Sequence, residues 1–191
     1  LTGPLPSLTN WTGLKLFDVE ENKFTGPAFV DTTGLDGLQS YRVSFNDLTG
    51  TVSTQLPGSL RELWFADNDL EGVLPTSIGN SPLLTSLIMD NSRLQGPLPS
   101  ALGALNLQRL QAQANAFSGT LPSELFNNTE LLELRLEQNK FTGSIPPGLG
   151  NLVDLRILGF GENAFTGTLP SEVAQLSKLG TFIVFCCCEA R

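Results

Sequence analysis

The chain has 191 residues, a net charge of −8, three Cys and no His. This acidic balance argues against nucleic acid or an anionic membrane surface as the main partner. Without His, the chain cannot form a Ser-His or Cys-His catalytic arrangement, and it lacks the commonest general base near neutral pH. No apolar run reaches the roughly 20 residues that span a bilayer, so we expect a non-enzymatic chain without a membrane span.

One phrase recurs along the whole chain: Leu-x-x-Leu-x-Leu-x-x-Asn-x-Leu-x-Gly-x-Leu-Pro. A fixed period of this size is typical of a solenoid, in which each repeat is one structural unit stacked on its neighbours. Function is therefore expected on a surface that several repeats build together. The Asn position returns at steps of 22 to 24 residues, at Asn22, Asn46, Asn68, Ser92, Asn115, Asn139, Asn163 and Cys187.

Each repeat predicts the same elements in the same order. Apolar residues five and three positions before the Asn alternate with other residues, as Leu63 and Phe65 do around Trp64. This alternation is the pattern of a strand with one buried face, and such strands should stack as a parallel sheet. On the return path, apolar spacings of about three predict short 3-10 turns, as at Leu102, Leu105 and Leu107 or Leu149, Leu152 and Leu155. The core should contain Leu and the series Phe24, Phe117, Phe141 and Phe165.

A Gly-x-Leu/Ile-Pro unit follows the Asn in most repeats and predicts a second short strand. Proline should end this strand because it cannot donate to a ladder. The ending is lost at Gly26-Pro27-Ala28-Phe29 and at Gly50-Thr51-Val52-Ser53, so the second strand is in doubt in the N-terminal third. The prolines of the regular units are Pro75, Pro99, Pro122, Pro146 and Pro170.

These units resemble the plant-specific subclass of leucine-rich repeat proteins, over nearly the whole chain. Asn139-Lys-Phe-Thr-Gly-Ser-Ile-Pro146 and Asn163-Ala-Phe-Thr-Gly-Thr-Leu-Pro170 are similar to units of receptor-like kinase ectodomains and of polygalacturonase-inhibitor-like proteins. The resemblance implies an α/β solenoid whose concave parallel sheet binds proteins, peptides or small hormones. It implies receptor-like recognition and signalling without a cofactor, and leaves a secreted inhibitor of a hydrolase as the alternative.

The ends of the chain predict a fragment of a longer protein. Leu1 begins in the middle of a phrase, and the C-terminus stops four residues after Cys187. An uncapped solenoid would expose its apolar core at both ends. We expect one array over residues 1–191, with seven complete Asn-type turns and partial terminal repeats.

Two residues replace the Asn, which carries both a donor and an acceptor for the turn. Ser92 can satisfy fewer groups, and we expect Asn91 beside it to compensate. Cys187 is expected to point inward as a structural residue, while Cys186 and Cys188 are either free thiols or partners for missing sequence. Their adjacent positions do not suit a zinc site, so no metal is predicted.

Two columns of residues, four and two positions before each Asn, should face out from the concave sheet. Arg42, Trp64 and Ile88 are expected to be contiguous, since neighbouring strands lie about 4.8 Å apart. An exposed Trp beside Arg suggests a binding hot spot, although Trp64 could instead only pack against Arg42. Gly159 and Gly161 would leave bare backbone for a ligand or be weak strand residues. The candidate binding residues are Arg42, Phe45, Trp64, Asp67, Ile88, Asp90, Gln111, Gln113 and Arg135.

Two further patterns bear on location and on a different function. Asn10-Trp11-Thr12 and Asn127-Asn128-Thr129 match the glycosylation tripeptide, so Asn10 and Asn127 are candidate sugar sites or ordinary loop residues. Together with the family resemblance, they favour an extracellular or plasma-membrane ectodomain. Small hydroxyls in triplets such as Thr49-Gly50-Thr51 and Thr142-Gly143-Ser144 form a column, as on some ice-binding surfaces, and this is the less favoured alternative.

Overall fold

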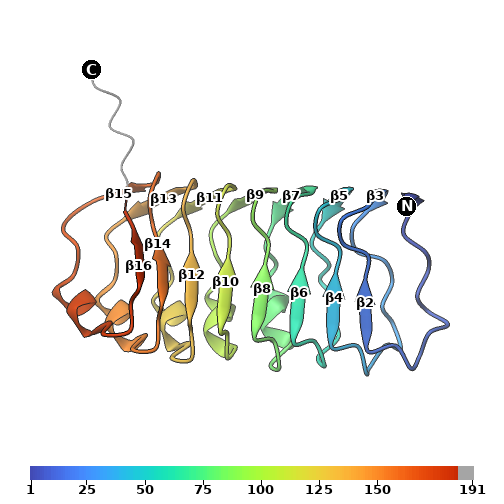
Figure 1. Cartoon of the computed structure of the whole chain (residues 1–191), viewed down its shortest axis with the longest axis horizontal. Coiled ribbons are helices and arrows are strands. Elements are labelled where there is room, and N and C mark those ends of the chain that lie inside the picture. The colour runs from blue at the N-terminus through green and yellow to red at the C-terminus, as the bar shows by residue number, and fades with distance from the viewer. Residues whose placement is uncertain (185–191) are drawn as a thin grey trace, which may run out of the picture.

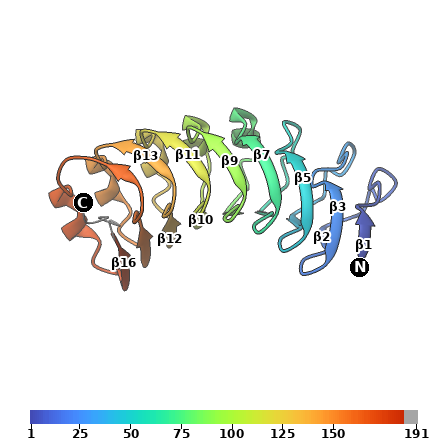
Figure 2. The same ribbon diagram turned by 90° about the horizontal axis from the view of Figure 1, so that it is seen from above.

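The computed structural model describes residues 1–184, which form a solenoid of two parallel sheets (Figure 1). Viewed from above, the array is curved, and the strands with even numbers lie on its inner side (Figure 2). The concave sheet consists of β2 (Leu16–Asp18), β4 (Ser40–Arg42), β6 (Glu62–Trp64), β8 (Ser86–Ile88), β10 (Arg109–Gln111), β12 (Glu133–Arg135), β14 (Ile157–Gly159) and β16 (Thr181–Ile183). The second sheet consists of β1 (Thr2–Pro4), β3 (Lys23–Pro27), β5 (Asp47–Thr51), β7 (Asp69–Val73), β9 (Arg93–Gly96), β11 (Ala116–Gly119), β13 (Lys140–Gly143) and β15 (Ala164–Phe165).

The recurring Asn of the phrase links each repeat to the one before it by hydrogen bonds. Asn139 donates to the carbonyl oxygens of Leu136 and Glu137 at 3.2 and 3.1 Å and to that of Ala112 at 2.9 Å. Its own Oδ1 accepts from the backbone N–H of Phe117 at 3.0 Å. The amide thus satisfies backbone groups that the turn would otherwise leave buried without partners. From Asn22 to Asn163, the Gly four residues after each Asn position has a left-handed φ of 75° to 93°, which explains its fixed place.

The series of Asn side-chain hydrogen bonds that links the repeats, here called the Asn ladder, is weaker at Ser92, as the single hydroxyl of Ser92 predicts. Ser92 Oγ donates to the Asp90 carbonyl oxygen at 3.5 Å. Asn91 does not compensate, because its amide is exposed and donates to Asp67 instead. That expectation was wrong because the residue before each Asn position adopts a left-handed turn that directs its side chain outward.

A continuous core runs between the sheets. Leu residues fill most of it, and Phe24, Phe117 and Phe141 are buried while Phe165 is half-buried. The rings of Phe117, Phe141 and Phe165 stack in sequence, with centroids 6.2 and 6.0 Å apart. Offset stacking of this kind adds to the free energy gained from apolar burial. The predicted core series is confirmed.

Within residues 1–184 the return side carries five 3-10 helices, and each begins directly after a proline of the Leu/Ile-Pro ending. These prolines are extended, as at Pro75 with φ −72° and ψ 148°. All five helices have five residues, and no helix within residues 1–184 is long and apolar enough to cross a membrane. They are η1 (Thr76–Asn80), η2 (Ser100–Ala104), η3 (Ser123–Asn127), η4 (Pro147–Asn151) and η5 (Ser171–Gln175).

The doubt about the N-terminal second strands was wrong. The strands β3 and β5 have five residues each, longer than the four of β9, β11 and β13. Their strands run from the residue after the Asn to the residue after the Gly, a stretch that these repeats keep, and the Leu-Pro ending lies beyond the strand. The described connections from β3 to β4 and from β5 to β6 have no 3-10 helix, and neither has the connection from β1 to β2, which keeps the ending at Leu5-Pro6.

Candidate functional site

Three positions of each repeat, six, four and two before the Asn, face the hollow of the array. The first and second lie at the ends of each three-residue strand, and from β2 to β14 a buried Phe, Tyr or Leu lies between them, as in Ser40-Tyr41-Arg42. Sequence reasoning chose the second and third columns and missed the first. The two-residue period of a strand would have found it, since residues i and i+2 share a face. The missed column includes Ser40, Glu62, Ser86, Arg109 and Glu133.

Arg42 and Glu62 form the best-defined ion pair of this face. Arg42 donates from Nη2 and Nε to Glu62 Oε2 at 2.6 and 3.1 Å, and Nη1 lies 3.4 Å from Asp18 Oδ2. Ser40 Oγ also donates to Glu62 at 2.7 Å. Burial would raise the pKa of the Glu62 carboxyl, but the hydrogen bonds from Ser40 and Arg42 outweigh it and lower that pKa.

Trp64 lies on β6, the third strand of the concave sheet from its N-terminal end, and is fixed by its neighbours. The guanidinium carbon of Arg42 lies 4.1 Å from the ring centroid and that of Arg109 lies 5.4 Å from it. The indole Nε1 donates to Ser86 Oγ at 2.9 Å. Trp64 is therefore half-buried, not freely exposed as the sequence predicted, because arginines from β4 and β10 cover part of its ring.

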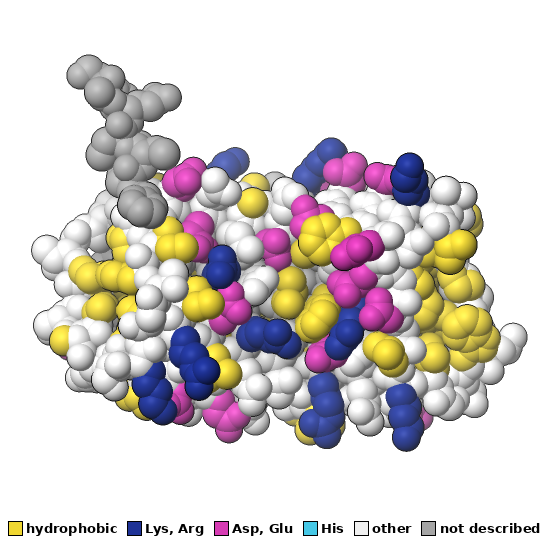
Figure 3. Space-filling model, viewed as in Figure 1, with side chains coloured by type: hydrophobic (Ala, Val, Ile, Leu, Met, Phe, Trp, Pro, Cys, Tyr) yellow, Lys and Arg dark blue, Asp and Glu magenta, His cyan; other side chains and the backbone are white. Residues whose placement is uncertain are grey.

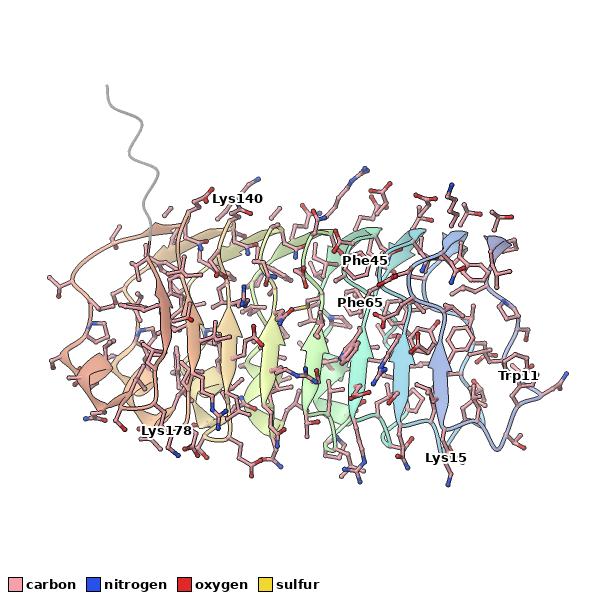
Figure 4. The ribbon with its side chains drawn as sticks, viewed as in Figure 1. Trp11, Lys15, Phe45, Phe65, Lys140 and Lys178 are labelled. Carbon is pink, nitrogen blue, oxygen red and sulfur yellow. The ribbon has the colours of Figure 1, made fainter. Side chains whose placement is uncertain are left out.

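A pocket of about 260 Å³ opens beside Trp64. It brings together five of the predicted residues, and the turn before Asn46 positions one of them: Phe45 has a φ of 57° and is 52% exposed. Phe45 lies near the upper ends of β4 and β6 (Figure 4). The pocket is lined by Phe45, Trp64, Ile88, Asp90 and Gln111, together with Glu20, Ser44 and Ala66, which belong to the predicted outward column but were not among the candidate binding residues.

Two carboxylates face this pocket without an ion-pair partner among the described residues, Glu20 and Asp90. Burial raises the pKa of Asp90, with the Asp67 charge acting in the same direction. Burial also raises the pKa of Glu20, with a contribution from Asp18. In the space-filling view, Asp and Glu side chains surround a hydrophobic patch over the upper part of the concave sheet (Figure 3).

The remaining predicted residues lie outside this pocket. Asp67 lines a separate polar hollow with Asn91, beyond the strand ends. Arg135 is paired with Glu133 on β12. Gln113 follows β10, which lies between β8 and β12, and it does not line the pocket. Arg42 contacts the pocket only through Trp64.

The strand of Gly159 does not offer bare backbone to a ligand. The carboxylate of Glu137 lies over Gly159, where an added Cβ would overlap it, and both Gly159 and Gly161 are buried. Gly159 therefore makes room for a neighbouring side chain, which corrects the reading of that residue as bare backbone open to a ligand. The residues Phe185, Cys186, Cys187 and Cys188 lie outside the described residues.

Two other predicted surfaces can be placed. Asn10 and Asn127 are both exposed, whereas the neighbouring Asn128 is buried and its Oδ1 accepts from the Leu107 N–H at 2.9 Å. The column of hydroxyls on the second sheet is interrupted, because Glu71 on β7 and Gln95 on β9 occupy the Thr position before the Gly.

Comparisons with known proteins agree with this architecture. A family model described as Leucine Rich Repeat matches residues 59–81 and 130–152. The chain is 35% identical over 132 residues to the leucine-rich repeat receptor protein kinase MSL1 of Oryza sativa subsp. japonica, an alignment that covers 66% of the chain and 9% of that protein. It therefore spans only a small part of this relative.

Solved structures share the fold over nearly the whole chain. The plant peptide hormone receptor RGFR1, solved in complex with RGF2, matches with a TM-score of 0.91 and 30% identity, over 97% of this chain and 31% of that one. A plant ice-binding protein matches with a TM-score of 0.76 and 23% identity, over 97% of this chain and 68% of that one. The second likeness concerns the fold alone.

Proposed function

Because the chain is a leucine-rich repeat protein similar to plant receptors, we propose that it recognises a protein or peptide ligand through its concave sheet. The similar receptor RGFR1 was solved with RGF2 bound. The role proposed here is recognition without catalysis, as the extracellular part of a receptor-like protein.

The observation that carries this proposal is the pocket beside Trp64, where residues of successive repeats meet. Phe45, Trp64 and Ile88 supply apolar surface, and a half-buried Trp is among the residues that contribute most to binding energy. The contacts from Arg42 and Ser86 hold the indole in place before any ligand arrives. A ligand therefore loses less free energy to ordering this side chain than it would on a mobile surface.

An unbiased library of displayed linear peptides, selected on the purified chain, tests the proposal. We expect peptides that bind the chain and lose about tenfold or more in affinity when Trp64→Ala or Ile88→Ala is introduced. The control is Val153→Ala, because Val153 is exposed on the return side. Equal affinities of the peptides for the parent chain and for Trp64→Ala would show that the concave pocket does not bind them.

The alternative of a secreted hydrolase inhibitor has its own measurement. We expect the purified chain to leave the rate of a secreted polygalacturonase unchanged at micromolar concentration. If the chain slows the enzyme and Trp64→Ala abolishes this inhibition, the concave face is an inhibitor surface.

An extracellular location is part of the proposal and is supported by the two exposed Asn residues of the glycosylation tripeptides, Asn10 and Asn127. Mass spectrometry of the protein purified from its native host should detect a loss of mass on treatment with a glycosidase that removes N-linked sugars. The Asn10→Gln and Asn127→Gln double variant should lose this response. An unchanged mass for the parent chain would count against secretion through the glycosylating pathway.

A further inference from the structure

We propose that the pocket beside Trp64 receives a basic side chain, Lys or Arg, of the ligand, with its alkyl stem against the apolar wall and its charged head toward Asp90. This inference rests on the proposed function, since it assigns a chemistry to the ligand of the same face. The structure supports it in three ways: the composition of the walls, the unpaired carboxylates and the charge of the surroundings.

The walls suit a side chain that is apolar along most of its length. Phe45, Trp64, Ala66 and Ile88 line the pocket from three neighbouring repeats, while Glu20, Ser44, Asp90 and Gln111 supply polar groups. Its volume of about 260 Å³ admits one long side chain. Lys and Arg bury their methylene stems along apolar surface and keep the charged head near polar groups. The pocket has the same division between apolar walls and polar groups.

The carboxylates of the pocket differ from those of β6 and β12 on the concave sheet, although Glu137 likewise has no ion pair within residues 1–184. Glu62 is bound by Arg42 and Glu133 by Arg135, whereas Glu20 and Asp90 have no ion pair within residues 1–184. One oxygen of Asp90, Oδ1, is also buried without a hydrogen-bond partner. A buried acceptor in this state costs free energy that a donor from a ligand can recover.

Two of the nearby arginines are engaged elsewhere, and the third, Arg109, lies over the Trp64 ring and is not among the charges that act on Asp90. Arg42 is bound to Glu62 and Asp18, and Arg135 is bound to Glu133. Asp67 and Glu133 act on Asp90 as like charges, against the single opposing charge of Arg135. A ligand cation would therefore be attracted to this place rather than repelled from it.

Charge on the larger scale points the same way. The chain carries a net charge of −8, and acidic side chains surround the hydrophobic patch of the concave face (Figure 3). A negative field of this kind raises the association rate of a cationic ligand, and the effect weakens with added salt. An acidic peptide would meet the same field as a barrier.

The test uses a codon-balanced library of linear heptapeptides selected on the parent chain and on three variants. Asp90→Asn and Glu20→Gln remove the charges of the pocket, and Glu71→Gln removes one exposed charge on the second sheet as the matched control. We expect Lys or Arg to be enriched about fivefold at one peptide position on the parent chain and on Glu71→Gln, and lost on Asp90→Asn. Glu20→Gln should reduce this enrichment less than Asp90→Asn does, since the buried carboxylate oxygen without a partner belongs to Asp90 and not to Glu20.

A second measurement compares one selected peptide with its norleucine analogue, which keeps the stem and lacks the charge. On the parent chain the analogue should bind about tenfold more weakly, and on Asp90→Asn the two peptides should bind alike. Binding peptides with a preferred aliphatic or aromatic residue at the anchor position would overturn this inference and leave the proposed function standing. If no peptide is enriched above a chain-free control, both the inference and peptide recognition fail.

Discussion

Arg42 stacks on Trp64 with its guanidinium carbon 4.1 Å from the ring centroid, while the same guanidinium binds Glu62 at 2.6 Å. One side chain thus joins an aromatic and a carboxylate from the neighbouring strand. We expect a double-mutant cycle of Arg42→Met and Glu62→Gln to give a coupling free energy of about 1 kcal/mol in urea unfolding, because both groups are half-buried. Additive effects of the two substitutions would show that the pair contributes nothing to stability.

The Asn ladder should dominate the stability of each repeat. Asn139→Ala removes four hydrogen bonds and leaves backbone groups without partners, so we expect a loss of about 2–3 kcal/mol in the free energy of unfolding. Urea denaturation followed by circular dichroism measures it. A loss below that of a typical exposed Asn→Ala substitution would contradict the bonding scheme.

Ser92, where the Asn ladder is weak, allows the opposite substitution to be tested. Ser92→Asn should restore the bonds made at the other Asn positions and stabilise the chain by about 1 kcal/mol. Asn91→Ser is the matched control, because the Asn91 amide is exposed and lies outside the ladder. A destabilised Ser92→Asn chain would show that the repeat has adapted its backbone to the smaller residue.

Close packing between the return turns also has a testable consequence. A Cβ at Gly103 of η2 would overlap the Glu124 carbonyl of η3, whereas at Gly58 the nearest atom would be 3.5 Å away. We expect Gly103→Ala to lower the free energy of unfolding by about 1–3 kcal/mol, and Gly58→Ala to change it little. Equal effects of the two substitutions would mean that η2 and η3 are not in contact.

The pH dependence of stability should reveal the buried charge of Asp90. Its pKa is raised above the usual value of 3.8 by burial, so the ionised form destabilises the folded chain at pH 7. This cost disappears as the pH falls through the raised pKa. We therefore expect Asp90→Asn to raise Tm at pH 7, and the difference from the parent chain to shrink toward pH 4. A difference that is independent of pH would contradict the assignment.

The repeat explains why so much of the fold could be predicted. The Asn and the Gly impose a hydrogen-bonded turn and a left-handed residue in every unit, so the register follows from two residue types, as in Asn139 and Gly143. The strands, the core Phe series and the 3-10 turns all follow from that register.

The site was harder to predict, because it depends on contacts between repeats. Periodicity placed Trp64 on the concave face, but whether Arg42 and Arg109 cover its ring depends on side-chain conformations that no spacing encodes. The outward direction of Asn91 and the overlap of Glu137 with Gly159 are of the same kind. Glu62 and Arg109 could have been predicted as concave-face residues, since they share a face of their strands with the predicted column.

A crystal structure of the chain with a selected peptide tests the central claim most directly. We predict that the peptide crosses the concave strands β4, β6 and β8 and places one side chain in the pocket against Trp64. A peptide bound to the return side, or to the edge of the second sheet, with the pocket beside Trp64 empty, would contradict the claim that the concave sheet is the recognition surface.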